Sequence, residues 1–566
     1  MSKIYIEQHN LNDTEAIQAE LEGFLQQTFQ SSREVETWLK NLSTFDDELR
    51  EALDGHYIDF QAHNQDQQAK EAFEHDQEKI EPLIKTYTAK LDEKLMSSPF
   101  KDELDPKQYG RFLRSKENAM ELFREENVTL EVEEDRLATR YFELTGGLSV
   151  DWNGEEKTIP ELFPLLEDPD REIRKSAFDK IFQTLSKVEH DLQEIMDKLM
   201  KLRKQKAANS GLSNYRDYMF KKYERFDYTP EDCKQLAASI REYVVPLAEK
   251  IKKQKKKELG VEVLRPYDRS AVPKDRTPLK PFAQRDELVE RTSKALGQLE
   301  PRFSELIDTM NEKGMLDLET RRNKSPGGFC TPLPVSELSF IFMNASHTHD
   351  DMMTLFHEMG HCIHNDLKRH LPLSYDRNTP MESSELASMT MELFSIDQWD
   401  HFYSKEEQKQ AKLDLLRDIV TFFPSAIRVD QFQHWMYENP DHTQEERMAK
   451  FGELSRELSD GVIDWSGYED ARNKEWLFIL HIFEVPFYYV EYVIAQLGAL
   501  QMYKNYKEDP AGTLARYKHA LALGNTQSLY EVYEAAGIRF DFSGEMIKEL
   551  MEFLEEEISA VEQMKV

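Results

Sequence analysis

The residues best suited to chemistry in this sequence lie in FHEMGHCIH, residues 356–364. His357 and His361 are four positions apart, so on a helix both imidazoles project from one face and can hold one metal ion. Glu358 lies one position further round, where its carboxylate can reach a water molecule beside the metal. Two neutral imidazoles plus a carboxylate suit Zn²⁺, with a fourth position left for water whose pKa the ion lowers. The pattern therefore predicts one catalytic zinc ion with a general base.

The segment DDMMTLFHEMGHCIHNDL, residues 350–367, is the helix expected to carry these side chains. His364 is interpreted as a packed or supporting histidine rather than a ligand. Asp351 could orient a ligating imidazole or could equally be an exposed cap residue. The apolar residues of the segment form one stripe at helical spacing, which consists of Met352, Leu355, Phe356, Met359, Ile363 and Leu367.

A catalytic zinc needs a third protein ligand, and the sequence excludes one source for it. The metzincin pattern requires glycine at 364 and histidine at 367, where this chain has His364 and Leu367. The next predicted helix begins in TPMESSELASMTMELF, with Thr379 as N-cap, Pro380 at the first helical position and Glu382 completing a capping box. Because this gives Glu382 a local structural task, the ligand is expected further along the same helix.

Two carboxylates remain on that helix, Glu385 and Glu392, seven positions apart on one face. Small Ala387 and Ser388 lie between them and would let the two helices approach closely. We predict Glu385 as the third zinc ligand, and Glu392 as its reserve or as a partner that supports another ligand.

Three tyrosines form a second group of interest, in WLFILHIFEVPFYYVEYVIAQLGAL. Tyr488, Tyr489 and Tyr492 fall within one helical turn after Pro486, with His481 just upstream. A hydroxyl or imidazole aimed at the zinc could stabilise the oxyanion of a tetrahedral intermediate. Sequence physics alone slightly favours the alternative, which is an ordinary core helix with its hydroxyls at the surface.

Strand-forming residues precede the metal helix in GGFCTPLPVSELSFIFMNAS, residues 327–346. The segment opens with Gly327 and Gly328 and ends in an apolar run. Such a strand could offer its edge to an extended peptide through main-chain hydrogen bonds, or it could lie wholly inside a small sheet. The sequence leaves these two readings equally open.

The elements that must position these residues are predominantly helical. The 566 residues include only 21 glycines and 32% charged residues, and apolar residues recur every three to four positions. Amphipathic helices are expected from about residue 12 to 145 and again from 168 past 206, with a hairpin between them at Asn153–Gly154. Four prolines make residues 264–282 an ordered loop.

Composition limits the partners and the location of the protein. A formal net charge of −34 argues against nucleic acid or an anionic membrane as the main partner. The basic run at 250–259 is read as a solvated helix face. No apolar segment of signal-peptide or membrane-spanning length is evident, and three cysteines are too few for a disulfide framework, so we expect a cytoplasmic protein. The oligomeric state stays open.

The segments FHEMGHCIH, ELASMTME and HIFEVPFYYVEYVIAQLGAL, in this order, resemble the M3 family of zinc metallopeptidases, in the oligoendopeptidase F branch of the thimet oligopeptidase superfamily. The likeness extends from about residue 100 to 566. It implies a mainly α fold: a large helical ellipsoid with a deep substrate channel, a zincin-type catalytic core and a small β-sheet. Residues 1–200 would form a helical N-terminal region and one wall of the channel, and residues 201–566 the catalytic domain.

The resemblance also implies a role for each matching residue. Zinc would be held by His357, His361 and Glu385, with Glu358 as general base and later as proton shuttle. The segment at Gly327–Gly328 would align the peptide backbone. Binding of substrate and stabilisation of the transition state would fall to His481, Tyr489 and Tyr492, with Tyr488 beside them.

We therefore predict a zinc-dependent endo-oligopeptidase that hydrolyses internal bonds of short unstructured peptides. One alternative is a zinc exopeptidase. Another is a non-catalytic helical peptide-binding protein with a structural zinc. The presence of Glu358 argues against this last reading, because a purely structural site needs no base.

Overall fold

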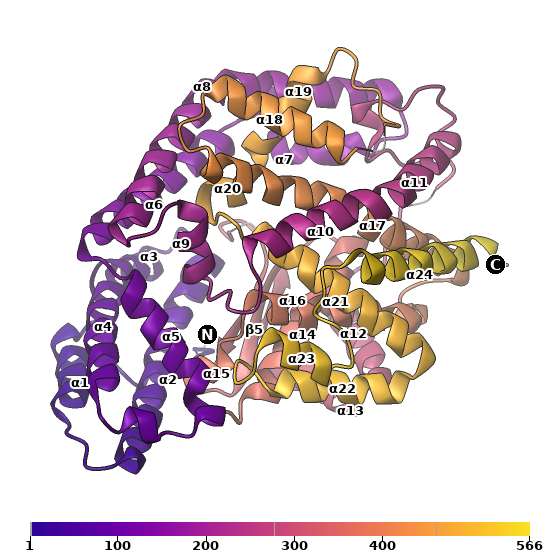
Figure 1. Ribbon diagram of the computed structural model, residues 1–566. Coiled ribbons are helices and arrows are strands. Elements are labelled where there is room, and N and C mark those ends of the chain that lie inside the picture. The colour runs from indigo at the N-terminus through magenta and orange to yellow at the C-terminus, as the bar shows by residue number, and fades with distance from the viewer. Residues whose placement is uncertain (1–2, 277, 326, 460, 566) are drawn as a thin grey trace.

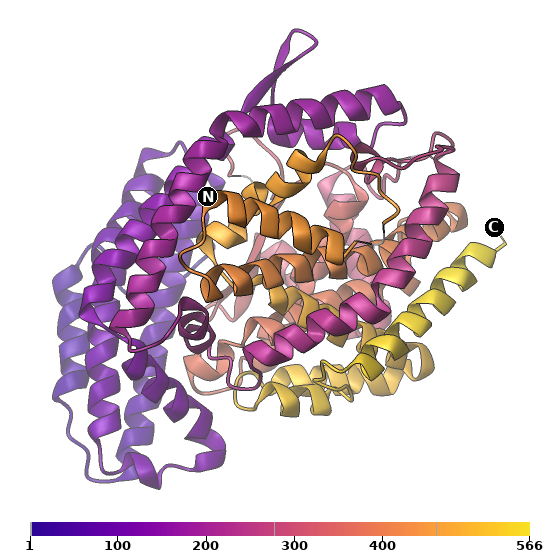
Figure 2. The ribbon, with the colours of Figure 1, turned by 45° about the horizontal axis from the view of Figure 1, so that its top comes forward.

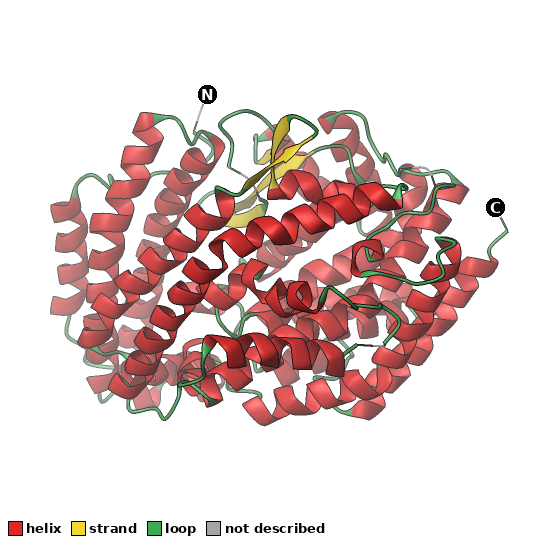
Figure 3. Cartoon of the chain, turned by 90° about the horizontal axis from the view of Figure 1, so that it is seen from above, coloured by secondary structure: helices red, strands yellow, loops and turns green. Residues whose placement is uncertain are grey.

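Helices dominate the computed structural model, which describes residues 3–276, 278–325, 327–459 and 461–565. Figure 3 shows them surrounding a small sheet. The predicted mainly α fold is thereby confirmed. The chain runs from N-terminal helices on one side of the molecule to C-terminal helices on the other. The helix that carries His357 and His361, α14 (His349–Lys368), lies between them (Figure 1).

The N-terminal helices form a region with a core of its own. Trp38, Leu49, Leu91 and Tyr109 belong to this core, and Leu373 from much later in the chain packs into it. The predicted hairpin is present as β1 (Ser149–Trp152) and β2 (Glu155–Thr158), and it projects from the molecule in Figure 2. The helices that supply this core are α1 (Thr14–Gln26), α2 (Ser32–Ala62), α4 (Glu81–Ser97) and α5 (Pro106–Leu122). The N-terminal part of the chain also contains α3 (Gln67–His75), α6 (Glu125–Gly146), α7 (Ile159–Leu162) and the long α8 (Arg171–Asn209), and α6 and α8 pack into the larger core described next.

The remaining helices surround a larger core to which every predicted stripe residue of the metal helix contributes. Within its described residues, the predicted loop at 264–282 includes a short 3-10 turn at Pro266–Asp268. The helices are α9 (Tyr215–Lys222), α10 (Pro230–Tyr243), α11 (Val245–Glu258), α12 (Arg285–Leu299), α13 (Pro301–Glu312), α14 (His349–Lys368), α15 (Ser374–Arg377), α16 (Met381–Ser395), α17 (Lys405–Glu438), α18 (Gln444–Glu457), α19 (Glu469–Lys474), α20 (Leu480–Glu484), α21 (Tyr489–Glu508), α22 (Pro510–Ala522), α23 (Leu529–Ala535) and α24 (Gly544–Gln563).

The segment before α14 forms two strands rather than one. In a sheet of order β3-β5-β4, the apolar run is the central strand β5 (Leu338–Ala345), parallel to β3 (Leu316–Glu319). The residues after the glycine pair form the antiparallel edge strand β4 (Phe329–Leu333). The apolar run thus lies inside the sheet, as one reading expected, while β4 lies at its edge because the turn at residues 334–337 lets the chain reverse direction. Pairing of this edge with a peptide stays a prediction.

Close packing of α14 against α16 fixes the geometry of the site. Gly360 makes it possible, since a Cβ there would lie 2.5 Å from the Cα of Ser388 and 2.8 Å from the carbonyl oxygen of Ala387. The small residues that the sequence placed at this contact are thus where the two backbones meet. Across the described residues, no helix combines the length and apolar character needed to cross a membrane.

Candidate active site

The three predicted zinc ligands come together at the contact between α14 and α16. His357, His361 and Glu385 each present a donor atom, and these three atoms all lie within 4.8 Å of one another. His357 Nε2 is 3.4 Å from Glu385 Oε2. Two ligands of one tetrahedral zinc are separated by about 3.3–3.7 Å when the ion lies about 2.0–2.3 Å from each. The donor set and its spacing therefore fit Zn²⁺.

Neighbouring groups orient both imidazoles. His357 Nδ1 lies 2.6 Å from Glu392 Oε1, and an ionised carboxylate can only accept, so Nδ1 donates this hydrogen bond and Nε2 is the nitrogen that faces Glu385. The ring of His361 is paired with the backbone of Ser384. Each ring thus retains one nitrogen for a metal, the arrangement expected when carboxylates or carbonyls support ligating histidines.

Glu358 lies one position round the helix, as predicted, with 7% of its surface exposed. Burial raises the pKa of its carboxyl to about 7; the positive charge of a protonated His357 opposes the rise, while Glu385 and Glu392 add to it. A carboxylate with a pKa close to neutral can both accept and return a proton at physiological pH.

A cavity of about 1080 Å³ connects this cluster to the N-terminal helices. One wall includes Leu39 and Asp54 from α2 and Ile84 from α4. The opposite wall carries the metal cluster and part of the edge strand, namely Gly328, Phe329, Cys330, His357, Glu358, His361 and Glu385. The volume lies at the upper end of the range for small-molecule sites, which suits several residues of an extended chain.

Two of the predicted tyrosines line the same cavity as Glu385. Tyr488 and Tyr492 are among its lining residues, whereas His481 and Tyr489 are absent from that lining in the described structure. His481 instead contacts the tyrosines, with ring centroids 4.9 Å from Tyr489 and 5.8 Å from Tyr488. Burial and the charge of Glu385 raise the pKa of Tyr492 to about 12, so its hydroxyl stays protonated and able to donate.

Comparisons with known proteins assign the chain to a family. A family model described as peptidase family M3 matches residues 164–552, and one for the peptidase M3 N-terminal domain matches residues 8–123. The chain belongs to peptidase family M3. The resemblance inferred from the sequence segments is thus confirmed, and the N-terminal match extends it to residues 8–100, where the sequence segments indicated only helices.

Curated and solved relatives agree with this membership of family M3. Oligopeptidase PepF of Bacillus subtilis is 23% identical over 444 residues, which cover 73% of this chain but 61% of that protein. An oligoendopeptidase F homolog of Lactococcus lactis is 21% identical, covering 71% of this chain and 65% of its own. Two solved structures superpose with TM-scores of 0.88 over 98% of both chains: PZ peptidase A with an inhibitor, 26% identical, and an oligoendopeptidase F, 25% identical.

The predicted capping of α16 is wrong in this M3 chain. The helix starts at Met381 with Pro380 as N-cap, and no side chain caps it. Glu382 instead accepts a 2.6 Å hydrogen bond from the hydroxyl of Tyr228, because both side chains are buried and each needs a partner. The elimination that led to Glu385 therefore rested on a false step, although the geometry brings Glu385 to the histidines independently.

Two further side chains of α14, Asp351 and His364, have structural positions rather than positions at the metal cluster. Asp351 completes a capping box with Thr348 at the start of α14, so it is the cap residue rather than an orienting partner. His364 is 2% exposed and packed inside, and it lies outside the ligand cluster.

Some residues of the cavity were not predicted from the sequence. Lys368 lines it, and burial lowers the pKa of this lysine to about 7. Its position seven residues after His361, on the same helix face, was the available signal. The thiols of Cys330 and Cys362 also meet there, with their sulfurs 3.5 Å apart. Nothing in the sequence spacing joins a strand cysteine to a helix cysteine.

Proposed function

We propose that this M3 protein is a zinc-dependent endo-oligopeptidase that hydrolyses internal bonds of short unstructured peptides. One observation carries the proposal: His357, His361 and Glu385 converge beside buried Glu358 in the wall of a peptide-sized cavity. When bound there, Zn²⁺ would act as a Lewis acid that polarises a carbonyl and lowers the pKa of a water.

Glu358 is proposed as the base that takes a proton from the attacking water and returns it to the leaving amine. Tyr488 and Tyr492 border the cavity with protonated hydroxyls, and they are the proposed donors to the developing oxyanion. His481 and Tyr489 contact these tyrosines and are proposed to hold them in place. The edge strand β4 and Gly328 before it would pair with the peptide backbone, with Gly327 leading into this segment.

The first test is Glu358→Gln, which removes the base and keeps the size of the side chain. Peptide hydrolysis should fall by at least about 10²–10⁴-fold, the usual contribution of general acid–base catalysis, while zinc content and thermal stability stay normal. Activity is measured on internally quenched peptides and metal by elemental analysis. Near-normal turnover by a pure, zinc-loaded Glu358→Gln protein would overturn the proposed mechanism.

Glu385→Ala provides the matching test of the metal site. This variant should lose both zinc affinity and activity, because two imidazoles alone hold zinc weakly. Undiminished metal content would transfer the ligand role to Glu392.

Peptides blocked at both ends separate the alternatives. An endopeptidase cuts them, an exopeptidase needs a free terminus, and a non-catalytic binder leaves them intact. Mass spectrometry of the products, with and without a chelator, reads out all three results.

A further inference from the structure

A second cluster of metal-binding residue types lies between α10 and α17. Cys233 on α10 and Asp430 and His434 on α17 each present a donor atom, and these atoms lie within 4.8 Å of one another. Asp430 and His434 are four positions apart, the same spacing as His357 and His361, so both project from one face of α17. Cys233 and Asp430 are fully buried and His434 is 2% exposed.

The polar atoms of this cluster are poorly satisfied by protein groups. Among the described residues, neither ring nitrogen of His434 has a hydrogen-bond partner, and Oδ1 of Asp430 has none either. Oδ2 of Asp430 accepts from Gln431 Nε2 at 3.0 Å. Unpaired polar atoms are costly to bury, so a ligand that engages one ring nitrogen of His434 and a carboxylate oxygen of Asp430 would be favoured here.

The spacing of the donors repeats that of the proposed catalytic site. His434 Nε2 lies 3.4 Å from Asp430 Oδ2, the same separation as His357 Nε2 from Glu385 Oε2. It falls within the range of about 3.3–3.7 Å expected for two ligands of one tetrahedral zinc. The aromatic rings of Phe220 and Phe487 contact the His434 imidazole edge-to-face, at 6.1 and 5.3 Å, and would hold its orientation.

The charges of the donors match a divalent cation. A thiolate, a carboxylate and a neutral imidazole together carry −2, so a divalent ion leaves the buried cluster neutral. Sulfur and nitrogen donors together select Zn²⁺ over Mg²⁺ or Ca²⁺.

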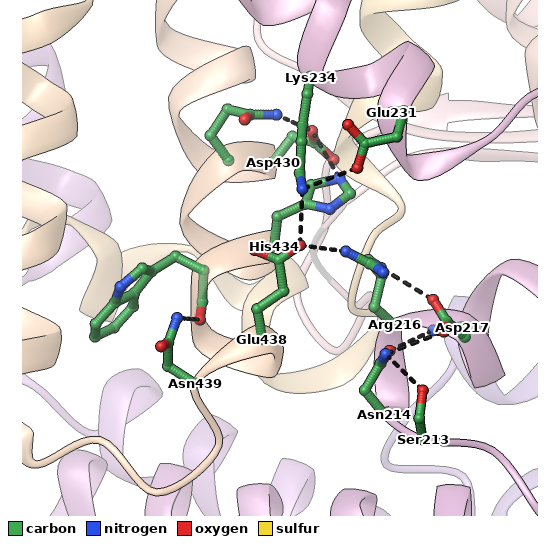
Figure 4. Close-up of polar contacts among 12 residues, drawn as sticks. Ser213, Asn214, Arg216, Asp217, Glu231, Lys234, Asp430, His434, Glu438 and Asn439 are labelled. Atoms are coloured by element: carbon green, nitrogen blue, oxygen red, sulfur yellow. Dashed lines mark hydrogen bonds and ion pairs between the residues drawn. The ribbon is translucent and has the colours of Figure 1, made fainter.

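We propose that Cys233, Asp430 and His434 bind a structural Zn²⁺ ion that joins α10 to α17. In Figure 4, His434 and Asp430 lie side by side on α17, and the ion pairs of Lys234 with Glu231 and Glu438 lie next to them. Lys234 and Glu438 are each more than a third exposed, so their pair contributes little to holding the helices together. The buried metal would supply the stronger connection.

Such an ion would also support the region of the tyrosines. Gln433, next to His434, accepts a 2.8 Å hydrogen bond from the backbone N–H of Phe487, the residue before Tyr488. The proposal does not depend on peptidase activity, because it uses none of the residues assigned to catalysis.

Cobalt replacement tests the site, since a thiolate bound to Co²⁺ gives a charge-transfer band in the near ultraviolet that histidine and carboxylate ligands do not. The full chain is produced in cobalt-supplemented, zinc-depleted medium, so that metal is present during folding, and is kept reduced. We expect two cobalt ions per chain together with the band. Cys233→Ser should lose the band and one equivalent of cobalt, whereas Glu385→Ala should lose one equivalent and keep the band.

Cys362→Ser is the matched control for the band, because it removes the other buried thiol and should leave the band in place. If Cys233→Ser does not fold, His434→Gln and the spectrum of the unmodified protein decide the question. The proposal would be overturned if the unmodified protein bound a single cobalt ion per chain, showed no band, and lost that ion in Glu385→Ala. His434 and Asp430 would then be a buried ion pair without a metal. A band that persists in Cys233→Ser would overturn it as well.

Discussion

Glu392 makes one contact with the proposed metal site, a hydrogen bond with His357. Its carboxylate accepts the hydrogen bond from His357 Nδ1 at 2.6 Å, which fixes the tautomer of a proposed zinc ligand. Glu392→Ala should therefore lower zinc affinity by about 10–100-fold, the usual cost of losing a group that supports a ligating histidine. Competition with a chromophoric chelator measures this affinity. Glu392→Gln keeps an oxygen that can accept the bond and should lose less; equal losses in the two variants would contradict this role.

The contact of α14 with α16 is the element pair most sensitive to substitution. Gly360→Ala would place a methyl group 2.5 Å from the Cα of Ser388, and a backbone atom inside a packed helix cannot move aside. We expect a loss of stability of about 1–3 kcal/mol, with weaker zinc binding as the helices separate. Thermal unfolding and metal titration check the two effects. Gly23→Ala in α1 is the control: nothing lies within 4 Å of its Cβ, so it should be neutral or slightly stabilising.

A buried ion-pair cluster connects α2 to the short helical segment Asp76–Ile80 between α3 and α4, and to the N-terminal segment. Burial alone would lower the pKa of His56, but the hydrogen bond from its Nδ1 to Asp76 at 2.6 Å and the charges of Asp76 and Glu7 outweigh burial and raise it. A raised pKa in the folded state means that stability is fully present below about pH 6.5, the unfolded value, and is lost as pH rises through the folded value.

His56→Gln should therefore destabilise most at acidic pH, by about 1.5–3 kcal/mol, the usual contribution of hydrogen bonds to charged groups. The difference from the unmodified protein should shrink as pH is raised. Thermal unfolding midpoints between mildly acidic and alkaline pH give the comparison. His190→Gln, at a side chain that is 78% exposed, is the control and should change little at any pH. A constant effect of His56→Gln at every pH would rule out the linkage.

At the scale of the whole molecule, the cavity between the N-terminal helices and α14 is proposed to limit the size of the substrate. Its walls come from two regions with separate cores, and its volume of about 1080 Å³ holds part of an extended chain but no folded domain. We predict that a cleavable peptide is cut when free and spared when grafted into a loop of a stable domain. Gel electrophoresis and mass spectrometry follow both substrates. Rapid cutting of the folded host, compared with its unfolded form, would disprove this size limit.

Local patterns in the sequence were sufficient for the features that depend on neighbouring residues. The four-residue spacing of His357 and His361, the apolar stripe beside them and the hairpin at Asn153–Gly154 all follow from helix period or turn conformation, and all are present. Glu358 was identified in the same way, because its position relative to the histidines is a property of one helix. The division at residue 200 remains a prediction.

Tertiary packing decided everything that joins distant segments. The start of α16 was mispredicted because Tyr228, far away in sequence, takes the carboxylate of Glu382 that a local capping box would have used. Packing also put Glu385 beside His357 Nε2 and Glu392 beside His357 Nδ1, and sheet order made β4 rather than β5 an edge strand. Cys233 reaches His434 only because α10 packs on α17. The physical reason is common to these cases. The period of a helix or strand determines on which face of its own element a residue lies, but only the packing of elements determines which residues of another element it contacts.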